Sequence, residues 1–136
     1  MTAELPPEWE EFVRCFDRGD FWRSHEILEA PWRRHHSPFY KGMILYASAL
    51  VHVARGNPRG VLAQLAKAET HLRPFRPCYL GLDVNALLEH AGRCRKTIGA
   101  DPDAPRGGWR ERIPELRLDP RTRRVRGDEF ELRVGG

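Results

Sequence analysis

The segment FWRSHEILEAPW, residues 21–32, holds the densest group of side chains that could do chemistry. His25 and Glu29 are four residues apart, and Glu26 and Glu29 are three apart, so on a helix these side chains share one face. Imidazole and carboxylate groups on one face can bind a divalent metal that activates water for hydrolysis. The spacing is close to the zinc-binding H-E-x-x-H motif, but Glu29 stands where that motif has its second histidine.

A second polar group falls on a segment that is otherwise apolar nearly all round, MILYASALVHVA at residues 43–54. Such a composition predicts a central helix buried by its neighbours. The polar side chains of this predicted helix recur at helical spacing and form one stripe: Lys41, Ser48, His52 and Arg55. Because buried polar groups need partners, this stripe is expected to face other polar side chains.

Folding the chain back about the turn at residue 37 places the two groups at matching depths. His25 then lies level with residues 49–52, and Glu29 lies level with residues 45–48. Folding about residue 57 brings Glu69 close to the depth of Leu45, which is the level of Glu29. At about 1.5 Å of helix rise per residue, these levels predict a polar seam between the second, third and fourth helices.

Two functions fit this predicted seam. In the first, His25, Glu29 and His52 bind a divalent metal such as zinc, manganese or iron, and Glu26 serves as the catalytic base of a hydrolase. In the second, the glutamates pair with His52 or Arg55, and the seam is structural. The protein is then a non-catalytic binding or interaction module for a small molecule, a protein partner or a second copy of the chain.

Proline, glycine and capping residues divide the first hundred residues into five predicted helices. Aspartate, serine and asparagine favour helix N-termini, whereas glycine ends helices at little cost. In the second helix, predicted at about residues 20–35, Pro31 removes a backbone hydrogen bond and is expected to kink or end the helix. Short links predict an all-α, five-helix up-down bundle over residues 1–99. The breaks fall at Gly19-Asp20, Ser37-Pro38, Gly56-Asn57-Pro58, residues 73–77 and Asp83.

The character of the sequence changes after Gly99. Residues 99–108, GADPDAPRGG, have the composition of a linker. Apolar residues then alternate at period two, at Leu116 and Leu118 and again over residues 130–134. Residues 100–136 are therefore predicted to be a linker and a short extension resembling a β-hairpin. Two or three short strands are marginal alone, so this extension must pack on the bundle or on a partner.

Composition narrows the classes of function. The 136 residues fit one domain, 40% of them are hydrophobic, and no apolar run approaches the ~20 residues of a membrane span. Residues 1–99 carry fourteen Lys or Arg and eleven Asp or Glu, a net +3, and residues 100–136 carry nine and eight, a net +1. This balance disfavours a dedicated nucleic-acid binder, although Arg121, Arg123, Arg124 and Arg126 form one local basic cluster.

Neither the N-terminus nor the cysteines indicate secretion. The first residues, MTAELPPEWEEF, are acidic and proline-rich, unlike a signal or transit peptide. Three widely spaced cysteines fit neither a disulfide framework nor a zinc ribbon, so the expected compartment is the cytoplasm and the thiols are interpreted as structural. The remaining histidines, His35, His36, His71 and His90, are expected on the surface.

Several motifs in order resemble a known family. FWRSHEILEAPW is followed by YKGMILYASALVHVARGNPRG, LAKAETHL and LGLDVNALL. Over about residues 9–95 this pattern resembles the domain-of-unknown-function family 309 of bacteria and archaea. The resemblance implies a small all-helical protein of a family often described as predicted metal-dependent hydrolases. The motif positions are Trp22, His25, Glu26, Glu29, Trp32, Gly42, His52, Gly56 and Asn57.

Overall fold

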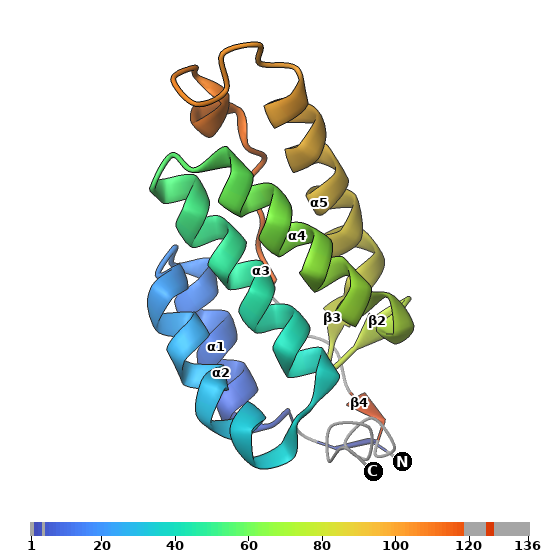
Figure 1. Cartoon of the computed structure of the whole chain (residues 1–136). Helices are drawn as coiled ribbons and strands as arrows, with labels where there is room; N and C mark the ends of the chain where they lie inside the picture. Colours follow the sequence, from blue (N-terminus) through green and yellow to red (C-terminus); the bar gives the residue numbers. More distant parts are fainter. Residues whose placement is uncertain (1, 4, 119–124, 127–136) are drawn as a thin grey trace.

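The structure is a computed structural model that describes residues 2–3, 5–118 and 125–126. Five α-helices dominate the described residues and run alternately up and down (Figure 1). They are α1 (Pro7–Asp17), α2 (Phe21–His35), α3 (Pro38–Ala54), α4 (Pro58–Leu72) and α5 (Val84–Gly99). Short 3-10 helices follow α4 at Arg73–Phe75 and α5 at Trp109–Arg112. The predicted all-α, five-helix class is confirmed.

The helices begin where the sequence predicted because their N-terminal backbone amides have side-chain acceptors. Ser37 accepts a hydrogen bond from the Tyr40 amide at 3.2 Å, ahead of a proline at the first position of α3. Asp20, Asn57 and Asp83 accept from amides three residues further on in the same way. Of the two outcomes expected at Pro31, the helix does not end there, because α2 continues to His35 as its predicted range of about 20–35 requires.

Helix α3 lies between α2 and α4, with α1 and α5 packed behind them (Figure 1). Ten of its side chains or glycines are buried, as expected for a central helix. Gly42 allows the close approach of α4, because a Cβ atom built at Gly42 would lie 2.7 Å from Leu72. Behind α3, the indole of Trp9 donates a hydrogen bond to the Leu80 carbonyl at 3.0 Å.

Two short antiparallel strand pairs complete the described fold. Strands β2 (Cys78–Tyr79) and β3 (Leu82–Asp83) form a hairpin between α4 and α5, and β1 (Thr2–Ala3) pairs with β4 (Val125–Arg126). Leu116 and Leu118 form no strand, contrary to the alternation of the sequence. The apolar residues 130–134 and most of the basic cluster at 121–126 lie outside the described residues.

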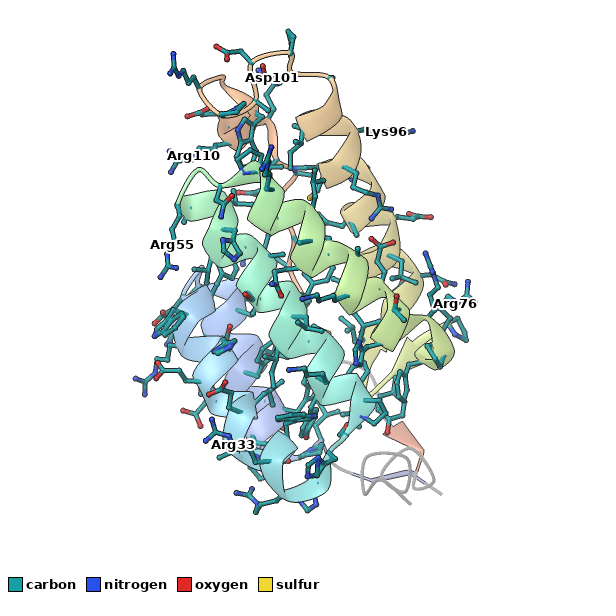
Figure 2. All side chains as sticks on the ribbon, viewed as in Figure 1. Arg33, Arg55, Arg76, Lys96, Asp101 and Arg110 are labelled. Atoms are coloured by element: carbon teal, nitrogen blue, oxygen red, sulfur yellow. The ribbon has the colours of Figure 1, made fainter. Side chains whose placement is uncertain are left out.

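Residues 109–118, which we call the C-terminal strap, pack along the bundle instead of forming a sheet. Trp109 at the start of the strap and Leu118 at its end are buried. Arg110 donates to the Val53 carbonyl at 3.0 Å and also to the Ala54 carbonyl, at the end of α3. The Leu118 amide donates to Asp17 at 2.8 Å. In Figure 1 the strap passes behind α3, and Figure 2 labels Arg110 beside the α3–α4 turn.

None of the helices in the described residues combines the length and the apolar character that crossing a membrane requires.

Candidate functional site

Two cation–π contacts fix the register of the predicted polar seam between α2 and α3. The guanidinium carbon of Arg55 lies 5.8 Å from the ring centroid of Trp22, and the ammonium of Lys41 lies 4.6 Å from that of Trp32. His25 is three residues along α2 from Trp22, and His52 is three residues back along α3 from Arg55. Because the helices are antiparallel, both steps run in the same direction, so His25 and His52 occupy the same level.

The structure brings His25 and Glu29 together. Nε2 of His25 lies 3.7 Å from Oε1 of Glu29, too far for a hydrogen bond but close enough for attraction if the imidazole is charged. Glu29 also lies 3.6 Å from the guanidinium of Arg33, on the outer side of α2. Nδ1 of His25 is buried and has no hydrogen-bond partner among the described residues. The imidazole therefore retains an unused coordinating or accepting nitrogen.

The third predicted ligand, His52, and the predicted base, Glu26, do not form a metal-binding group with this pair. Nδ1 of His52 lies 3.2 Å from the side-chain nitrogen Nδ2 of Asn57. The His52 ring also packs against Gly60, where an added Cβ would lie 2.5 Å from the same Nδ1. The side chain of Glu26 is exposed on α2. Across the part of the chain that the structure describes, no three His, Cys, Asp or Glu side chains lie close enough to hold a metal ion.

Glu69 does not take part in the seam, contrary to the folding-back argument. It is buried and pairs with Arg95 of α5 and, at 3.6 Å, with Arg73. Helix α4 turns this carboxylate toward α5 rather than toward α3. A depth estimate places residues along a helix axis but does not give the side of the helix on which they lie.

Trp22 is the large apolar side chain that the described surface leaves most open, with 55% of its area exposed. Its ring stacks on the His25 imidazole, with centroids 5.3 Å apart and planes 16° from parallel. Arg55 contacts the same indole from α3, and Figure 2 shows Arg55 extending from the end of that helix. We call Trp22, His25 and Arg55 the Trp22 platform.

The structure also reveals a buried polar cluster that the sequence reasoning missed. His90 is only 3% exposed, so the expectation that it is solvated was wrong. Its Nε2 lies 2.7 Å from the Pro114 carbonyl, which can only accept, and Nε2 therefore carries a proton. Its Nδ1 lies 2.6 Å from the Tyr46 hydroxyl, which also lies 3.1 Å from the Leu87 carbonyl. Cys94 contacts the same imidazole.

Burial controls the ionisation of this cluster. It lowers the pKa of His90, and Arg93 lowers it further, against the opposing hydrogen bond to Pro114. It also raises the pKa of Cys94 to about 11 and that of Tyr46 well above its usual range. The Cys94 thiol is therefore protonated at neutral pH and is not a nucleophile, in agreement with its interpretation as structural.

Fold and seam together define a small helical-bundle protein with an aromatic and polar face on α2 and α3. Residues 9–64 match the family model described as "Domain of unknown function (DUF309)". This segment therefore matches the family that the motifs resemble. The match ends within α4, before the LAKAETHL and LGLDVNALL segments that the resemblance also included. Searches of curated proteins and of solved structures found no match.

Proposed function

We propose that the protein is a non-catalytic binding module whose partner docks on the Trp22 platform. The observation that carries this proposal is the exposed indole of Trp22, which contacts both the imidazole of His25 and the guanidinium of Arg55. Tryptophan and arginine side chains dominate the binding energy of protein interfaces. An indole whose orientation is fixed in advance also loses less side-chain entropy when a partner covers it.

Charge indicates the chemistry of that partner. Helices α2 to α4 and their links, residues 21–72, carry seven Lys or Arg against three Asp or Glu. One of the three acids, Glu69, is buried and paired with arginines. The outer surface of these helices is therefore cationic and favours an acidic protein segment that offers an aromatic or apolar side chain to Trp22.

The proposal is tested first with a random copolymer of glutamate and tyrosine as an acidic, aromatic probe. Binding is measured by fluorescence and calorimetry for the full chain, for Trp22→Ala and for Arg59→Gln, an exposed cation outside the platform. We expect salt-sensitive binding that Trp22→Ala weakens about tenfold or more and that Arg59→Gln nearly preserves. Equal binding by Trp22→Ala, or tighter binding of a DNA oligonucleotide, contradicts the proposal.

A partner from the cell is then sought by affinity capture with the same three proteins and quantitative mass spectrometry. The informative signal is a protein that the wild type and Arg59→Gln retain and that Trp22→Ala loses. Unfolding midpoints must agree among the three proteins, so that the loss reports on the platform rather than on the fold. A set of captured proteins that is the same for all three variants counts against the platform as the docking site.

A metal-dependent hydrolase is the second candidate function. It is favoured by the proximity of His25 to Glu29 and by the His25 Nδ1, which has no hydrogen-bond partner among the described residues. His25, Glu29 and His52 are the proposed ligands, and Glu26 is the proposed base. His25 and Glu29 alone do not supply the three protein ligands that catalytic zinc sites usually have, so no reaction step is derived from them.

The metal hypothesis is tested by elemental analysis of protein purified without chelators and by thermal unfolding with zinc, manganese or iron. A ligand that binds only the folded state and is present at a hundred times its dissociation constant stabilises that state by about 2.7 kcal/mol. We expect a rise in melting temperature that the double variant His25→Ala/Glu29→Ala abolishes and that His71→Ala retains. If the purified protein holds no metal and added metal does not raise its melting temperature, this function is contradicted.

A further inference from the structure

A cavity of about 360 Å³ lies between the α1–α2 turn, the end of α3, α5 and the C-terminal strap, and its lining includes no residue of the Trp22 platform. Much of its wall is apolar. The apolar lining comes from three parts of the chain that are far apart in sequence: Phe16 and Phe21, Leu50 and Val53, and Ile113 and Leu116. Its size falls within the range of small-molecule sites, which are mostly apolar with a few placed polar groups.

Arginines outnumber carboxylates at this cavity, and these groups differ in whether they are already hydrogen-bonded within the protein. Arg18, Arg110 and Arg117 line it, against Asp17 and Glu115. Asp17 already accepts a hydrogen bond from the Leu118 amide, and Arg110 is bound to carbonyls at the end of α3. Arg18 donates to the Cys15 sulfur at 3.3 Å, a weak acceptor that leaves most of its guanidinium free.

Arg117 is exposed and forms no ion pair within the described residues. Two arginines, Arg18 and Arg117, are thus available at the mouth of the cavity, against one carboxylate, Glu115. An anionic group with an apolar body satisfies both parts of this site, because arginine binds carboxylates through charge-assisted hydrogen bonds.

The walls of the cavity are held in place. His90 at the wall is hydrogen-bonded to Pro114 of the strap and to Tyr46 of α3, and Phe16 packs edge-on against Phe21 at 5.0 Å. The strap is fixed to the bundle at both ends through Arg110 and Leu118. A pocket whose walls are already fixed binds its ligand with little cost of ordering.

We propose that this cavity is a binding site for a small amphipathic carboxylate. The hydrocarbon part lies against Phe16, Phe21 and Leu50, and the carboxylate lies at Arg18 and Arg117. The site is separate from the Trp22 platform and does not depend on the function proposed for it.

Octanoate, octan-1-ol and octylamine are matched probes, since they share one chain and differ in the charge of the head group. Binding to the full-length protein is followed by calorimetry and by amide chemical shifts in NMR spectra. We expect octanoate to bind about tenfold more tightly than octan-1-ol, with shifts at residues 16–21, 50–54 and 110–117, and no binding of octylamine. Equal affinity for the acid and the alcohol, tighter binding of the amine, or shifts confined to other residues overturns the proposal.

Variants separate the charge from the cavity. Arg18→Gln is expected to weaken octanoate binding about tenfold. Arg14→Gln replaces an exposed arginine of α1 that lies outside the cavity and is expected to preserve binding. Val53→Phe fills the cavity and is expected to abolish binding. Should Val53→Phe fail to fold, the Arg18 and Arg14 pair still decides the outcome. Trp22→Ala must leave octanoate binding unchanged, so failure of the platform and failure of the cavity remain distinguishable.

Discussion

Replacement of His90 by alanine is expected to destabilise the fold by about 2–4 kcal/mol. The imidazole makes two buried hydrogen bonds, one to the Pro114 carbonyl and one to the Tyr46 hydroxyl. Loss of the bond to Pro114 costs about 1 kcal/mol net, and the carbonyl left without its donor costs about 1–3 kcal/mol more. The Tyr46 hydroxyl adds little to this cost, because it can still donate to the Leu87 carbonyl.

Urea unfolding followed by circular dichroism measures this change, with an unchanged dependence of the free energy on urea as the sign of two-state behaviour. The matched control is His71→Ala, since the one hydrogen bond of the His71 ring within the described residues is to a carbonyl of its own helix. This variant is expected to change stability by less than about 0.5 kcal/mol. The corresponding loss in melting temperature for His90→Ala is roughly 8–15 °C.

The same variant should also release the strap. In hydrogen exchange, the amides of residues 113–118 are expected to exchange faster in His90→Ala than the change in global stability requires, because the Pro114 anchor is lost. Stability within about 0.5 kcal/mol of wild type, or a loss equal to that of His71→Ala, would refute the view that His90 fastens the strap to the bundle.

Three further outcomes are expected. Because burial lowers the pKa of His90, the unfolded chain takes up a proton at a higher pH than the folded protein does. The contribution of neutral His90 to stability is therefore fully present above the unfolded pKa of about 6.5 and is lost as the pH falls through the folded pKa. His90→Gln should remove this component, as seen by comparing urea midpoints at neutral and acidic pH. Gly42→Ala should cost about 1–3 kcal/mol by forcing α4 away from α3, whereas Gly99→Ala, with open space around its Cβ, should be neutral or slightly stabilising by calorimetry. Arg95→Met should cost about 1–3 kcal/mol in the same assay, because Glu69 stays buried with one cation fewer, and the double variant with Glu69→Leu should regain part of that loss.

Helix boundaries could be predicted from the sequence because local chemistry determines them. Ser37, Asn57 and Asp83 each cap the helix that the sequence assigned to them. The level of His25 against His52 also followed from local information, since a short turn leaves two antiparallel helices little freedom in register. These parts of the fold depend on residues that are close together along the chain.

Side-chain direction could not be predicted in the same way. Glu69 turns to Arg95 and His52 turns to Asn57, although the predicted depth of Glu69 is that of Glu29 and the predicted depth of His52 is that of His25. The choice depends on the rotation of each helix about its axis, which long-range packing determines. His90 illustrates the same limit, since it lies at the edge of the apolar face of α5 and is buried only because the distant strap covers it.

The two candidate sites differ in how much of each lies within the segment that matches the family model. Trp22, His25 and Arg55 all lie within residues 9–64, so the platform is built entirely from the matched segment. The cavity combines Phe16 and Leu50 from that segment with His90 and the strap, which lie beyond it. A function that follows from the family segment alone must therefore use the platform or the His25–Glu29 pair. Carboxylate binding in the cavity, in contrast, requires a strap packed as it is here, and Trp22→Ala and Arg18→Gln test the two independently.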